Sequence, residues 1–115
     1  MGKYKEMDYD LFNHYFYYDE TSKTSLRWKV NKGRVRKDTV AGTYYSQGYY
    51  IVRLNKECYL VHRVVWLLLH GEIDSDLMID HIDRNKLNNK GDNLRQVTQA
   101  ENNKNRPSQY KKKVN

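Results

Sequence analysis

The sequence predicts an α+β domain, in which a small N-terminal antiparallel sheet and a buried helix precede a strand–loop–strand–helix unit. Three observations carry this prediction. Short aromatic or alternating segments between polar turns are typical of antiparallel strands. The stretch 62–70 places apolar side chains at helical spacing. Finally, a polar loop between two short strand-like segments is followed by a helix-capping pattern. At 115 residues, the chain is expected to form one compact domain.

The N-terminal region is expected to begin with a short helical turn. Residues 8–18 are dense in aromatic side chains and should pass from this turn into a strand. The polar stretch 19–24 predicts a turn, and 26–30 predicts the returning strand. Residues 31–39 are basic and mostly polar, which indicates a loop.

A hairpin and a helix are expected in the middle of the chain. Residues 49–54 alternate as a strand does, 55–57 form a tight connection, and 58–61 pair back. The helix over 62–70 should bury a stripe of apolar side chains, and Gly71 is a natural residue to end it. The stripe consists of Val61, Val64, Val65, Leu68 and Leu69.

The last unit has two short strands around a polar loop. Residues 78–82 and 94–97 predict the strands, and the loop from Asp83 to Asn93 is rich in turn-forming residues. Thr98 and Glu101 match a capping box, which opens a helix. This helix should end before Pro107 because the residue before a proline avoids helical angles.

Composition favours a polyanionic partner. The net charge is +7 and the isoelectric point is near 9.4. The lone Cys58 excludes an intramolecular disulfide and fits a reducing compartment. The longest apolar run, 64–69, is far shorter than the roughly 20 residues of a membrane span. We therefore expect a cytoplasmic protein with no membrane partner.

A candidate metal site can be derived from the residues themselves. With Thr98 as the N-cap, Asn102 occupies a position that is usually apolar, so its amide is available as an oxygen ligand. Asp80 supplies the anionic oxygen that a hard cation prefers. Asn105, on the same face of the helix, is a weaker candidate.

His81 is the candidate general base beside that metal. An imidazole is mostly neutral at physiological pH and can take a proton from water. Adjacent residues on a regular strand face opposite ways. Asp80 and His81 therefore share a site only if the strand ends or bends there.

The spacing of these residues resembles that of the HNH endonucleases of the ββα-metal fold, in particular the small phage and intron-encoded homing-type group. Asp80-His81 matches the Asp-His of that family, Asn93 its central Asn, and Asn102 its third position. The sequence VHRVVW at 61–66 also resembles that group, and the likeness runs from about Tyr49 to Asn105.

The resemblance implies a nuclease that hydrolyses DNA phosphodiester bonds with one Mg²⁺ or Mn²⁺ ion. It places Asp80 and Asn102 on the metal, makes His81 the base, and gives Asn93 the task of bracing the loop. Asn102 stands where many members have His, and an amide is the weaker ligand. We therefore expect an enzyme that nicks double-stranded DNA. Its single site favours a monomer, and the group that it resembles suggests a free-standing enzyme.

Three regions follow from this interpretation. Residues 1–61 would form an N-terminal sheet region with a possible DNA contact, 62–106 the helix and nuclease unit, and 107–115 a basic flexible tail. Expected contacts with nucleic acid come from Arg95, Arg63, Lys32, Arg34, Arg36 and Lys37.

Several polar residues of the chain are expected to have structural roles only. Asn85, Asn88 and Asn89 are expected to be turn formers, and His62 a satisfied structural histidine. Two other functions stay open for the chain: a non-catalytic DNA-binding protein on the same scaffold, and a basic, host-directed interaction protein.

Overall fold

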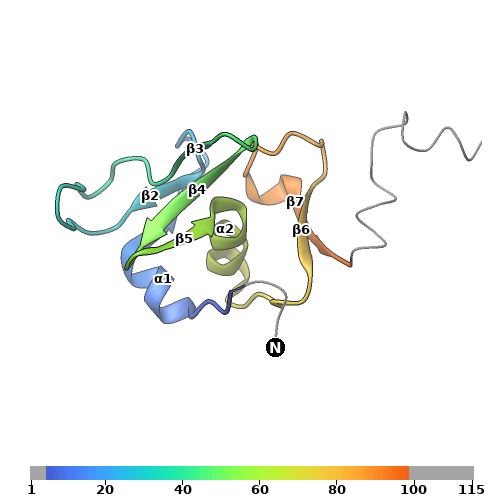
Figure 1. Cartoon of the computed structure of the whole chain (residues 1–115), viewed down its shortest axis with the longest axis horizontal. Coiled ribbons are helices and arrows are strands. Elements are labelled where there is room, and N and C mark those ends of the chain that lie inside the picture. The colour runs from blue at the N-terminus through green and yellow to red at the C-terminus, as the bar shows by residue number, and fades with distance from the viewer. Residues whose placement is uncertain (1–4, 99–115) are drawn as a thin grey trace, which may run out of the picture.

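The computed structural model describes residues 5–98 and confirms the α+β class. Figure 1 shows the arrangement of the elements. In chain order they are α1 (Tyr9–Tyr15), β1 (Phe16–Tyr18), β2 (Leu26–Trp28), β3 (Thr43–Tyr45), β4 (Tyr49–Leu54), β5 (Glu57–Leu60), α2 (Val61–His70), β6 (Met78–His81), the 3₁₀ turn η1 (Gly91–Asn93) and β7 (Leu94–Val97).

The strands of the described residues form three small antiparallel sheets, β1–β2, β3–β4–β5 and β6–β7. The expected single N-terminal sheet is thus two separate sheets, and β3 was not predicted as a strand. Arg27 of β2 bridges to Val40, but the ladder stops there. Gly42 follows with a φ of +104°. This left-handed conformation turns the chain away from β2 before β3 begins.

Helix α2 lies at the centre and begins one residue earlier than predicted, at Val61. The helix ends as expected at Gly71, whose N–H donates to the Leu67 carbonyl oxygen at 2.8 Å and whose φ of +82° turns the chain out of the helix. The helix contacts β1, β4, β5, β6 and η1. Its fully buried Val61, Val64 and Val65 join one hydrophobic cluster. The site described below therefore packs against a helix that belongs to the main core.

The β6–β7 hairpin packs against the core through alternate side chains. Ile79 and Leu94 lie on one face and join the core, while Asp80 and Arg95 face each other on the other face. The loop between the strands returns through η1, so the ends of the loop lie together (Figure 1). Within residues 5–98, no helix is long and apolar enough to cross a bilayer.

Candidate active site

His81 is the last residue of β6 and is 4% exposed. Its Nε2 lies 2.8 Å from Oδ1 of Asn89, which comes from the following loop. On another side, the ring of His62 from α2 meets it edge to face, with ring centroids 4.8 Å apart. Contacts from a loop and from a helix therefore hold the imidazole.

The contact with Asn89 favours one tautomer of His81. An amide oxygen only accepts hydrogen bonds, so Nε2 must donate, and Nδ1 is left with its lone pair. Asn89 is itself 1% exposed, and its Nδ2 has no hydrogen-bond partner among the described residues. The expectation that Asn89 forms a turn is therefore wrong: its side chain points into the core.

Burial is the main influence on the charge of His81. It lowers the pKa of His81, against the opposing effects of the Asn89 hydrogen bond and of the nearby Asp80 and Asp83 carboxylates. The lowered pKa keeps the ring neutral at physiological pH. A neutral ring with a free lone pair on Nδ1 is the state required of a proton acceptor.

His62 occupies the first turn of α2 and is almost fully buried. Burial, and next the charge of His81, lower the pKa of His62 to about 3. Its Nδ1 has no hydrogen-bond partner within the described part of the chain. The sequence predicted a satisfied structural histidine, whereas the structure shows an unsatisfied one packed on His81. The signal available in the sequence was its position at the start of the buried helix.

Asp80 pairs with Arg95, the residue directly opposite it on β7. Its Oδ2 accepts hydrogen bonds from Nε at 3.2 Å and Nη2 at 3.1 Å of that guanidinium. The Asp80 side chain is mostly buried, and that of Arg95 is about half exposed. Strand β6 ends at His81, although Asp80 and His81 both still pair with β7, opposite Arg95 and Leu94.

Asn93 closes the loop that carries these residues. Its Oδ1 accepts from the Asp83 backbone N–H at 3.0 Å, and its Nδ2 donates to Oδ1 of Asp83 at 3.0 Å and to the Asn88 carbonyl oxygen at 2.8 Å. In addition, its carbonyl oxygen accepts from the N–H of Ile82 at 2.8 Å. These bonds join the two ends of the loop and fix the end of β6.

Asn85 and Asn88 are turn formers, as the sequence predicted. Oδ1 of Asn85 accepts from the Leu87 N–H at 3.0 Å, and Oδ1 of Asn88 accepts from the Lys90 N–H at 3.3 Å. Both side chains act locally, in contrast to Asn89.

The structure does not bring every predicted contact residue to the site. Arg63 is 3% exposed and donates to the carbonyl oxygens of Leu77 and Asp74, at 2.9 and 3.3 Å. It therefore braces the segment between α2 and β6 from inside the protein. The four basic residues of the predicted contact loop follow β2, on the far side of the β4–β5 sheet from β6 and β7 in Figure 1; they are Lys32, Arg34, Arg36 and Lys37.

The structure describes only one of the two predicted metal ligands, Asp80. Residues 5–98 contain no group of three or more His, Cys, Asp or Glu side chains that could hold a metal. Asp80 offers a carboxylate that suits a hard cation. Asn102 and Asn105, together with the predicted helix, its Glu101 cap residue and the basic tail, lie outside the described residues.

Part of the chain is similar to known proteins. Residues 59–104 match the family model described as HNH endonuclease. Over 54 residues the chain is 44% identical to a protein of Acanthamoeba polyphaga mimivirus that is named as an uncharacterized HNH endonuclease. The match covers 46% of this chain and 29% of the viral protein, so it spans less than a third of that relative. No solved structure matches the chain.

Proposed function

We propose that the chain is a divalent-metal-dependent nuclease of the HNH type that nicks double-stranded DNA, a proposal supported by its similarity to HNH endonucleases over residues 59–104. The observation that carries the proposal is the state of His81. A buried, neutral imidazole with its proton on Nε2 has Nδ1 available to accept a proton from water. The net charge of +7 suits a DNA substrate.

Asn89 and Asn93 have separate positioning roles in this proposal. Asn89 orients the His81 ring and selects its tautomer through the 2.8 Å contact. Asn93 ties the two ends of the loop together and so fixes where β6 ends. Neither amide needs to touch the substrate to affect the reaction.

The residues present are compatible with a metal ion. Asp80, with Asn102 as the second ligand, would hold Mg²⁺ or Mn²⁺, which need few protein ligands. When bound, the ion neutralises the charge that develops on the phosphate and on the leaving 3′ oxygen. Arg95 already neutralises Asp80. Because its side chain is about half exposed, Arg95 can turn toward a substrate phosphate and leave the carboxylate to a cation.

The basic residues of the loop after β2 are proposed to contact the DNA backbone at a distance from the cleaved bond. We further propose a phage-type homing enzyme that acts as a monomer, since one site cuts one strand. The buried Arg63 contributes by bracing the chain before β6 rather than by reaching DNA.

A plasmid assay tests the proposal. Supercoiled DNA incubated with Mg²⁺ or Mn²⁺ should convert to the nicked circle. His81→Ala should slow this conversion by about 10²–10⁴-fold, the usual contribution of a general base. His14→Ala is the matched control, because His14 is an exposed histidine on α1, and it should cut at the wild-type rate.

Binding measurements separate the proposal from its main competitor. His81→Ala should still bind duplex DNA, and the affinity should fall steeply with salt. A wild-type protein that binds but never cuts with either metal would be a non-catalytic DNA-binding protein. The Asp80–Arg95 ion pair favours that alternative, since it occupies the carboxylate. A protein that neither binds nor cuts would act on another partner.

A further inference from the structure

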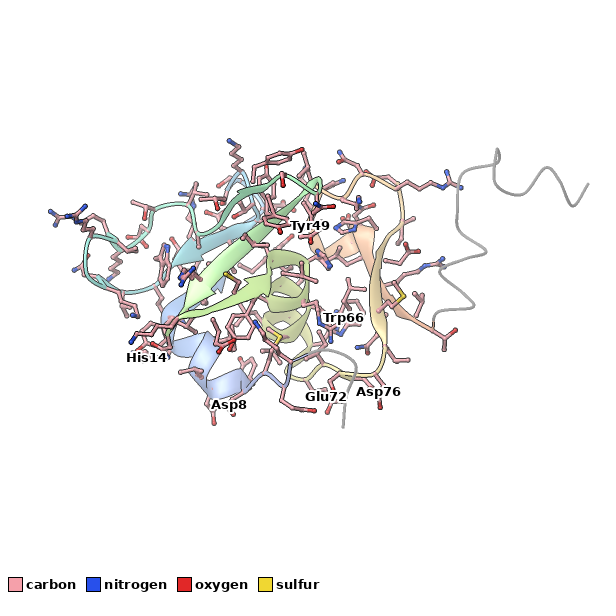
Figure 2. All side chains as sticks on the ribbon, in the orientation of Figure 1. Asp8, His14, Tyr49, Trp66, Glu72 and Asp76 are labelled. Carbon is pink, nitrogen blue, oxygen red and sulfur yellow. The ribbon has the colours of Figure 1, made fainter. Side chains whose placement is uncertain are left out.

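The turn of the β3–β4 hairpin lies against the loop between β6 and η1. A Cβ added at Gly48, in this turn, would lie 3.9 Å from Cε of Lys86 in the loop. The Nζ of Lys86 is 5.9 Å from the ring centroid of Tyr49, at the start of β4. Figure 2 labels Tyr49 at this end of the strand, beside the loop. Two segments distant in sequence thus meet next to the candidate active site.

Two tyrosine rings form a small platform at this junction. Tyr45 and Tyr49 are cross-strand partners, so their side chains lie on the same face of the hairpin. Their ring centroids are 5.4 Å apart, with an interplanar angle of 31°. Tyr45 is 41% exposed. Its neighbour Tyr44 points to the opposite face of the strand, where it meets the ring of Tyr50.

Ring contacts connect the platform to His81. The rings of Tyr49 and His62 meet edge to face at 6.5 Å, and those of His62 and His81 at 4.8 Å. The platform and the candidate base are therefore neighbours on one side of the molecule.

We propose that Tyr45, Tyr49 and Lys86 form a subsite that binds the DNA strand beside the phosphodiester served by His81. This inference rests on the proposed function and adds a place for the flanking nucleotides. The exposed ammonium of Lys86 is suited to pair with a backbone phosphate. The exposed ring of Tyr45 offers a flat face on which a base or sugar can stack.

The charges of the protein favour a DNA strand as the ligand of this subsite. A lone exposed tyrosine needs no explanation, since apolar atoms make up much of any protein surface. Here the exposed Tyr45 ring lies beside the partly buried Tyr49 ring, and Lys86 lies over Tyr49, in a protein of net charge +7. The Tyr49 ring in turn contacts His62 of the buried histidine pair. A DNA strand, which carries flat bases next to phosphates, matches both the tyrosine rings and the positive charge.

Salt-dependent binding tests the subsite with two variants. A fluorescein-labelled duplex of mixed sequence is titrated with protein by anisotropy, in EDTA, over a series of NaCl concentrations. Lys86→Ala should weaken binding and reduce the slope of log K against log salt by about one, the loss of one phosphate contact. Tyr45→Ala should weaken binding by about tenfold and leave the slope unchanged, because stacking releases no counterion.

Each variant has a matched control. Tyr44→Ala removes the adjacent tyrosine from the opposite face. Lys56→Ala removes a lysine from the turn at the other end of β4, about 17 Å along the strand. Both controls should bind as the wild type does. All four side chains are exposed, and thermal melting checks that each variant folds.

If either variant binds as its control does, the subsite is refuted. The nicking assay with the same proteins keeps this result apart from the proposed function. Weakened binding by both variants of a protein that does not nick would leave the subsite standing and reject the enzyme. Normal nicking at limiting DNA by Lys86→Ala and Tyr45→Ala would reject the subsite and leave the enzyme standing.

Discussion

Replacing Asn89 with alanine tests how the imidazole of His81 is held. The substitution removes the 2.8 Å hydrogen bond to Nε2 from a position that is 1% exposed. A hydrogen bond of this kind is worth about 1.4 kcal/mol, which corresponds to a tenfold change in rate. We expect kcat for nicking to fall by about tenfold. KM should stay the same, because a buried amide does not contact DNA.

The same substitution should have little effect on stability. It leaves Nε2 of His81 without an acceptor, which costs about 1–3 kcal/mol. It also removes the Asn89 Nδ2 group, which is buried without a partner among the described residues and carries a cost of similar size. The two terms oppose each other, so the free energy of unfolding should change by about 1 kcal/mol. Activity and stability should therefore separate in this variant.

Nuclear magnetic resonance of the ring nitrogens provides a test that does not depend on activity. The ¹⁵N shifts of His81 should show the Nε2–H tautomer in the wild type and a mixture in Asn89→Ala. Asn89→Asp keeps an acceptor oxygen and should restore the single tautomer. Asn85→Ala is the control, because Asn85 caps only its own turn. A wild-type ring protonated on Nδ1, or an unchanged kcat in Asn89→Ala, would refute the assigned role.

Two further predictions concern stability. The folded-state pKa of His62, about 3, lies below the ordinary value of 6.5, so its neutral form supports the fold fully above pH 6.5, and this contribution is lost as pH falls. Urea denaturation should show that the free energy of unfolding falls by about 2 kcal/mol between pH 6.5 and 5, and His81 should add to this loss. The His62→Phe variant should lose less over the same pH range. Equal losses in the two proteins would contradict the assignment. Asn93→Ala removes three side-chain hydrogen bonds and should lower the free energy of unfolding by about 3 kcal/mol. A loss well below about 1 kcal/mol in the same measurement would show that the loop closes without these hydrogen bonds.

Local patterns in the sequence predicted most of the regular elements. The strands over 49–54 and 94–97 have the predicted bounds, and the helix ends at Gly71 as expected. Alternation, helical spacing and glycine caps are properties of neighbouring residues, so they can be read without knowing the fold. Strand β3 was missed, although two tyrosines on either side of a turn containing Gly48 were a usable signal for a hairpin.

Local patterns did not predict which side chains of the loop between β6 and η1 are buried. Three asparagines lie within five positions of the loop, and the sequence predicted the same turn-forming role for all of them: Asn85, Asn88 and Asn89. Two of them cap turns, and the third is buried against His81. An irregular loop has no period, so nothing local indicates which side chain turns inward. That choice depends on where α2 presents His62 and where β6 ends.

The sequence by itself determined the family likeness, the α+β class and the order of Asp80, His81 and Asn93 along the last unit. Only the tertiary structure decided that Asn89 and His62 hold the His81 ring, that Arg63 is buried, and that the hairpin turn meets the loop at Lys86. Sequence spacing determines contacts within one element. Contacts between elements depend on how the sheets pack around α2, and that packing is a property of the whole core.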